Sequence, residues 1–160
     1  TVCREYAEKF GTDTGENLLF IGPTGLGKTH LSTSIARRVI DRAFNVVYDT
    51  AQNIFADFEY DRFSRSSNET PGERVSKYFD SELLILDDLG TELTNQFTIS
   101  CLYNLVNTRI NTGRAMIINT NLDQSELNKR YSDRITSRLF GEFRPLMFRG
   151  RDVRQQKLMK

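Results

Sequence analysis

One eight-residue segment constrains the fold of this chain more than any other feature: residues 22–29 have the sequence Gly-Pro-Thr-Gly-Leu-Gly-Lys-Thr. The apolar run Leu18–Ile21 precedes it, and Leu31, Ile35 and Val39 follow it at helical spacing. An apolar strand, a glycine-rich loop and a helix, in that order, are the context of a Walker A phosphate-binding loop. The segment therefore predicts an α/β fold that binds a nucleoside triphosphate.

The chemistry of the loop gives its residues their expected roles. Glycines let successive backbone N–H groups face a phosphate, and the following helix adds the positive end of its dipole. Lys28 is expected to reach the β- and γ-phosphates, and Thr29 to offer its hydroxyl to Mg²⁺. The nucleotide-binding residues expected from this motif are Gly22, Pro23, Thr24, Gly25, Leu26, Gly27, Lys28 and Thr29.

A second motif begins with the apolar run Leu83–Leu86 and ends in two carboxylates, as a Walker B strand does. Asp87 is expected to hold Mg²⁺ through water. Asp88 is expected to orient or deprotonate the attacking water, because adjacent residues at the end of a strand point in different directions. An acidic turn is the alternative, but the Walker A loop upstream favours a metal-and-water site. The expected cofactors are ATP or ADP and Mg²⁺.

Polar residues also follow the next apolar run, Arg114–Ile118. Asn119, Thr120 and Asn121 are expected at the same edge of the sheet, where one of them can hold the attacking water or the γ-phosphate. We favour Asn121 over Thr120. A turn-forming asparagine is the alternative, because Asn is common at strand ends for reasons of backbone geometry.

Arginines near the end of the chain are candidates for the γ-phosphate. Arg134 and Arg138 stand four residues apart in a predicted helix, so both project from one face; Arg154 is a further candidate. A cation delivered from an adjacent subunit would complete the site only on assembly. Self-association through Arg138 is therefore expected when ATP is bound, with solvated or ion-paired arginines as the alternative.

The rest of the chain alternates short apolar runs with helical patterns. The runs Asn17–Ile21, Asn45–Tyr48, Glu82–Leu86 and Arg114–Ile118 are typical of strands buried on both faces. Residues Asp61–Gly72, with their Ser, Asn, Thr, Pro and Gly content, are expected to form a flexible loop, and the last third of the chain to be mostly helical. The pattern predicts a three-layer α/β P-loop NTPase core with a parallel central sheet.

Length and composition fit one domain. The chain has 160 residues, 38% of them hydrophobic, and a net charge of +1. Its apolar runs are far shorter than the roughly 20 residues that span a bilayer, and Cys3 and Cys101 do not form a disulfide framework. A reducing cytoplasm is expected, without a membrane anchor. Residues 129–160 hold ten Lys and Arg against three Asp and Glu, which favours an anionic partner, with a solvated basic face as the alternative.

Four segments together resemble a known family: Gly-Pro-Thr-Gly-Leu-Gly-Lys-Thr-His-Leu, Leu-Asp-Asp-Leu-Gly, Thr-Asn-Leu and Ser-Arg-Leu are similar to those of DnaC/DnaI-type bacterial helicase loaders. These are AAA+ ATPases of the initiator clade, and the resemblance extends over nearly the whole chain. It implies that His30 belongs to the nucleotide-binding segment, that Asn121 is sensor 1, that Arg138 is the arginine finger, and that Arg154 is sensor 2.

The chain departs from the family pattern in three ways. Asp88 stands where most AAA+ proteins have Glu, which suggests slow or partner-stimulated hydrolysis. Few residues follow Arg154, so the helical lid is expected to be reduced or absent. The sequence begins at Thr1 rather than at an initiator Met. Residues 1–160 are therefore expected to be an AAA+ ATPase domain from a longer protein, without the N-terminal helicase-binding domain of such loaders.

The resemblance implies an ATP-driven loader that assembles on a hexameric replicative helicase and places it on single-stranded DNA. Residues Phe55–Phe79 interleave aromatics with cations, as single-strand binding requires, although core packing is the alternative there. An IstB-type transposition helper, which acts on duplex DNA, shares these motifs. A nucleotide-gated binding module with little turnover also stays open, whereas a small-molecule kinase would need an acceptor pocket that the sequence does not indicate.

Overall fold

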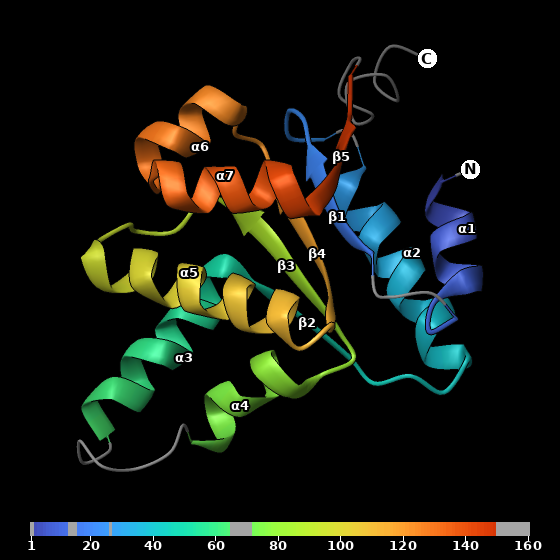
Figure 1. Cartoon of the computed structure of the whole chain (residues 1–160), viewed down its shortest axis with the longest axis horizontal. Helices are drawn as coiled ribbons and strands as arrows, with labels where there is room; N and C mark the ends of the chain where they lie inside the picture. Colours follow the sequence, from blue (N-terminus) through green and yellow to red (C-terminus); the bar gives the residue numbers. More distant parts are fainter. Residues whose placement is uncertain (1, 13–15, 26, 65–71, 150–160) are drawn as a thin grey trace.

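A parallel sheet organises the protein (Figure 1). The computed structural model describes residues 2–12, 16–25, 27–64 and 72–149. Its five strands lie in the order β2-β3-β4-β1-β5, and every neighbouring pair is parallel. The strands are β1 (Asn17–Ile21), β2 (Val46–Thr50), β3 (Leu83–Leu89), β4 (Ala115–Thr120) and β5 (Phe143–Met147). The predicted parallel sheet is therefore confirmed.

Helices cover both faces of the sheet (Figure 1). They are α1 (Val2–Lys9), α2 (Lys28–Asp41), α3 (Ala51–Ser64), α4 (Glu73–Asp80), α5 (Gln96–Asn111), α6 (Gln124–Arg130) and α7 (Asp133–Glu142). Successive strand residues point to opposite faces, so Leu18 and Phe20 pack with α1 and α2, whereas Leu19 and Ile21 pack with the other helices. The result is the three-layer α/β core that the sequence predicts.

The fifth strand, β5, was not predicted, because the last third of the chain was expected to be mostly helical. It pairs with β1 at one edge of the sheet, with Pro145 opposite Leu19. Only Phe143 in this strand is buried, so the strand lacks the apolar run that identifies the central ones. Proline is tolerated there because an edge strand needs no donor on its outer side.

Part of the expected flexible loop is helical. Asp61–Ser64 belong to α3, so the prediction of a loop over Asp61–Gly72 is wrong for these residues; residues 65–71 lie outside the described ones. Helix α3 continues because Ile54, Phe58 and Asp61 share its buried face. The Asp61 carboxylate also accepts a hydrogen bond from the backbone N of Gly72 at 2.9 Å, which brings the start of α4 against α3.

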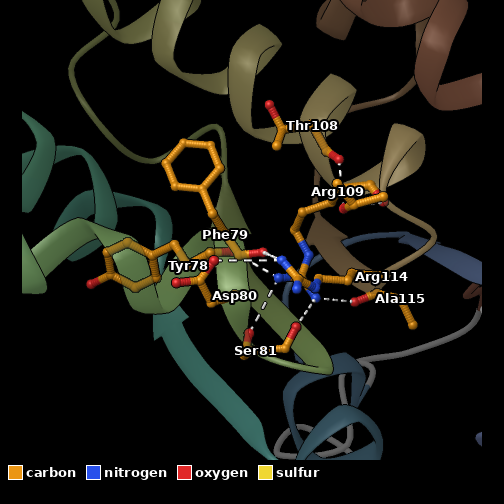
Figure 2. Close-up of polar contacts among 9 residues, drawn as sticks. Tyr78, Phe79, Asp80, Ser81, Thr108, Arg109, Arg114 and Ala115 are labelled. Atoms are coloured by element: carbon orange, nitrogen blue, oxygen red, sulfur yellow. Dashed lines mark hydrogen bonds and ion pairs between the residues drawn. The ribbon is translucent and has the colours of Figure 1, made fainter. Parts of the chain in front are cut away.

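A buried arginine joins the helical layer to the sheet (Figure 2). Arg109, in α5, is 0% exposed and donates to the carbonyl oxygens of Tyr78, Ser81 and Ala115 at 2.7–2.8 Å. Burial lowers the pKa of Arg109 to about 10, so the guanidinium stays charged at neutral pH. These contacts hold the end of α4 and the start of β4 together. None of the described helices is long and apolar enough to cross a membrane.

Candidate nucleotide site

The predicted site residues lie at the carboxyl edge of the sheet. Strands β1, β3 and β4 are neighbours and parallel, with Ile21 opposite Thr120 and Leu86 opposite Ile118. The loop after β1 and the acidic end of β3 therefore come together, although they are far apart in the sequence. This edge is where open α/β sheets bind their ligands.

Glycine is required where the loop leaves β1. The backbone N of Gly22 donates to the carbonyl of Thr120 at 3.2 Å, and a Cβ on Gly22 would lie 2.4 Å from the carbonyl oxygen of Phe148. Gly25 and Gly27 have φ of 88° and 89°, in the left-handed region that favours glycine. The loop thus has the backbone turns that a phosphate cradle needs, and α2 begins directly after it.

Lys28 lies inside this loop. Its side chain is 8% exposed, and Nζ donates to the carbonyl oxygens of Gly22 at 2.5 Å and Pro23 at 2.8 Å. Burial lowers the pKa of Lys28, while the charges of Asp88 and Asp87 raise it. The ammonium is therefore held among loop carbonyls and near both carboxylates, in the position from which it can bind phosphate oxygens.

Asp87 is the most enclosed carboxylate of the site, with 2% exposure. The Thr29 hydroxyl donates to its Oδ2 at 3.0 Å and lies 3.2 Å from its Oδ1. The backbone N of Asp88 donates to Oδ1 at 2.9 Å. The two oxygen groups predicted to hold Mg²⁺, from Thr29 and Asp87, therefore face one another across the carboxyl edge of the sheet.

These two groups fit Mg²⁺. No cluster of three or more His, Cys, Asp or Glu side chains suited to a metal occurs in the described ranges. Mg²⁺ does not need one, because it is usually bound through one or two carboxylates together with substrate phosphates and water. A hydroxyl and a carboxylate beside a phosphate loop are the hard oxygen ligands that it prefers.

Asp88 has an unusual backbone conformation. Its φ is 55°, and the pairing of β3 with β4 is irregular between Leu86 and Leu89. Asp88 is exposed here, whereas the neighbouring Asp87 is buried. Burial raises the pKa of Asp88, the charge of Asp87 raises it further, and Lys28 lowers it. A carboxylate held in a strained position at an open edge is suited to orienting water or accepting its proton.

Asn119 contacts this site, whereas the sequence favours Asn121 for this role. Its Nδ2 donates to Asp87 Oδ1 at 3.0 Å and to the Ser32 hydroxyl at 2.8 Å, and the side chain is 1% exposed. Asn121 is exposed just after β4. The sequence signal for Asn119 was a polar residue inside an apolar strand, because an amide buried there needs polar partners.

The comparison with known families agrees with this geometry. A model of the family described as IstB-like ATP binding protein matches residues 5–140. The chain belongs to this family. Its members are ATPases of the AAA+ type, and the fold of this IstB-like domain is the α/β P-loop NTPase fold.

Individual relatives of this IstB-like domain include a protein of an insertion sequence and a replicative helicase loader. An ATP-binding protein of an insertion sequence in Mycobacterium tuberculosis is 28% identical over 120 residues, covering 75% of this chain and 46% of the relative. The replicative helicase loader DnaC of Escherichia coli is 24% identical over 137 residues, covering 86% and 55%. A crystal structure of the DnaC helicase loader superposes with a TM-score of 0.80 at 20% identity, covering 92% and 86%. The chain thus spans about half the length of the curated relatives it matches.

The predicted arginine finger lies away from the phosphate loop. Arg138, in α7, forms an ion pair with Glu142 on its own helix at 3.6 Å. Arg134 stands over the ring of Tyr103 in α5, with its guanidinium carbon 4.3 Å from the ring centre. Among the described residues, the contacts of these two arginines involve α7 and α5 rather than Lys28 or Asp87. The structure therefore does not bring them into the site of their own chain.

The remaining predicted nucleotide-binding residues fall into two groups. Leu26 and Arg154 lie outside the described residues, and so does any lid that follows β5. Pro23, Thr24 and His30 are exposed at the mouth of the loop and on the first turn of α2, where a bound nucleotide can reach them.

Proposed function

We propose that this IstB-like domain binds and hydrolyses ATP with Mg²⁺ as part of a replicative helicase loader. The observation that supports the chemistry best is the convergence of Lys28, Thr29, Asp87 and Asp88 at one edge of the sheet. The similarity to DnaC over 86% of the chain supports the loader function. Such a protein acts in the cytoplasm, on a hexameric helicase and single-stranded DNA.

Each residue of the site has a part in the proposed reaction. Lys28 binds the β- and γ-phosphates, and Asp88 orients the attacking water and accepts its proton. Thr29 and Asp87 would hold Mg²⁺, which neutralises phosphate charge when bound. Asn119 positions Asp87 through the 3.0 Å hydrogen bond.

The missing part of the site is a cation at the γ-phosphate. Arg138 is partly exposed on α7, and among the described residues its ion pair is with the exposed Glu142, which costs little to break. We propose that it enters the site of a second copy of the chain when ATP is bound. Hydrolysis then depends on assembly, because the transition-state charge is neutralised only there.

The surface of α3 and α4 is suited to single-stranded DNA. Tyr60 and Phe63 are 55% and 81% exposed, whereas Phe58 belongs to the core. The guanidinium of Arg74 lies 4.0 Å from the centre of the Tyr60 ring, and Arg62 is exposed beside Phe63. Exposed rings can stack bases while arginines follow the phosphates.

A second candidate function has its own support. The insertion-sequence relative is 28% identical, compared with 24% for DnaC. An IstB-type helper would use the same ATP site to act on a transposase at duplex DNA. The ATP site is common to both functions, so only the partner separates them.

ATP hydrolysis by the full-length protein separates the two candidates. We expect single-stranded DNA and a hexameric replicative helicase to raise turnover, and Phe63→Ala to reduce the DNA response. Ile40→Ala, which removes an apolar side chain of 53% exposure on α2, is the matched control and should leave the response unchanged. Stimulation by duplex DNA alone would instead favour the transposition helper.

A further inference from the structure

Asp87 has a hydrogen-bond donor that neither Walker motif contains. Tyr48, in β2, donates its hydroxyl hydrogen to Asp87 Oδ2. Tyr48 lies opposite Ile85 on the neighbouring strand β3. Ile85 and Asp87 are two residues apart, so Tyr48 and Asp87 leave the sheet on the same face, the one covered by α2.

The hydrogen-bonding capacity of Asp87 is full. A carboxylate offers about four lone-pair directions, and the described residues supply a donor for each. Asn119 Nδ2 at 3.0 Å and the backbone N of Asp88 at 2.9 Å contact Oδ1. The hydroxyls of Thr29, at 3.0 Å, and Tyr48 contact Oδ2. A further donor, such as the hydration shell of Mg²⁺, can therefore reach Asp87 only if one of these four leaves.

Tyr48 is the donor that can leave at the lowest cost. Asn119 is 1% exposed, so its amide cannot replace the bond to Asp87 with a bond to water. The N–H of Asp88 belongs to the backbone and cannot rotate away. Thr29 is itself expected to bind the metal. The Tyr48 side chain is 38% exposed on an edge strand, so its hydroxyl can exchange the carboxylate for water by a side-chain rotation.

We propose that Tyr48 is a positioning residue that occupies Asp87 Oδ2 while no metal is bound and releases it when Mg²⁺ enters with the nucleotide. Its hydrogen bond thereby weakens Mg²⁺ binding and raises the Mg²⁺ concentration that tight nucleotide binding requires. The inference rests on the proposed ATP site alone and is independent of the helicase and of DNA.

The test is Tyr48→Phe in the full-length protein, with binding of a fluorescent ATP analogue followed over a range of Mg²⁺ concentrations. We expect the half-saturating Mg²⁺ concentration to fall about three- to tenfold, the equivalent of one ordinary hydrogen bond. Analogue affinity in EDTA should stay unchanged. Tyr103→Phe, which removes the hydroxyl of a tyrosine on α5 and keeps the ring beside Arg134, is the control and should behave as wild type.

An unchanged or increased Mg²⁺ requirement in Tyr48→Phe would overturn the inference. Because affinities with and without Mg²⁺ are measured on the same preparation, their ratio cancels any loss of folded protein, and thermal unfolding in EDTA reports that loss directly. Nucleotide binding by the wild type that is indifferent to Mg²⁺ would overturn the proposed metal site as well, so the two failures are distinguishable.

Discussion

The phosphate site and helix α7 are assembled in different ways. In the phosphate site, residues from two distant motifs meet within one chain: the Thr29 hydroxyl lies 3.0 Å from Asp87, and Lys28 is enclosed by its own loop. On α7, Arg138 is partly exposed, and within the part of the chain that the structure describes its ion pair is with Glu142 on the same helix, at 3.6 Å. Under the proposed function, one copy binds nucleotide unaided, whereas rapid hydrolysis requires Arg138 of a second copy.

The two regions are nevertheless connected through one buried carboxylate. Glu92, which is 4% exposed, accepts from the backbone N of Gly90 at 2.8 Å and from the hydroxyl of Tyr131. Gly90 lies just after Asp88, and Tyr131 lies just before Ser132, the N-cap of α7. The position of the helix that bears Arg138 is therefore fixed to the segment that follows the Walker B strand.

The largest expected effect is on the phosphate site itself. Lys28→Ala removes the buried ammonium and should weaken ATP binding by about 3–5 kcal/mol, more than a hundredfold in Kd, so that no turnover is detectable. Calorimetric titration with ATP measures the change in Kd. Lys77→Ala, on the exposed side of α4, is the control. Near-normal binding by Lys28→Ala would contradict the assignment of the loop.

Arg138→Ala should separate binding from turnover. We expect ATP affinity to stay within about twofold of wild type, while partner-stimulated turnover falls about 10³-fold, as when an arginine finger is lost. Arg38→Ala, which removes another exposed arginine, paired with Glu8 at 3.7 Å on the α2 face, should change neither quantity. Equal losses of binding in Lys28→Ala and Arg138→Ala would remove the contrast between the two regions.

Asp88→Asn tests whether the phosphate site catalyses a reaction or only binds. If Asp88 accepts the proton of the attacking water, turnover should fall about 10²-fold or more with binding retained. Steady-state hydrolysis and analogue binding measure the two quantities, with Asp41→Asn, at the exposed end of α2, as the control. An unchanged rate would favour a nucleotide-gated binding module.

The smallest expected effect concerns the connection through Glu92. Glu92→Gln leaves one of its two hydrogen-bond partners without an acceptor and should lower the free energy of unfolding by about 1–3 kcal/mol. Tyr131→Phe should cost as much or more, because it leaves Oε1 of the buried carboxylate without this donor while the bond to Gly90 remains. Urea denaturation measures the free energy of unfolding of both variants. If both variants were as stable as wild type, the contact through Glu92 would contribute little to holding α7 in place.

The parts of the site that are encoded by one continuous segment can be predicted from the sequence. The Walker A loop needs only its own glycines and the helix that begins directly after it. Asn119 and Tyr48 act on Asp87 from neighbouring strands. Their contacts depend on strand order and register, which no single segment encodes.

The most direct measurement of the central claim is turnover by a mixture of two inactive variants of the full-length protein, Lys28→Ala and Arg138→Ala. If Arg138 acts on the site of a second copy, an Arg138→Ala subunit keeps an intact phosphate site and receives Arg138 from a Lys28→Ala neighbour. The account predicts that the mixture regains stimulated ATP hydrolysis that neither variant shows alone. A mixture in which both variants assemble but hydrolysis stays absent would contradict it.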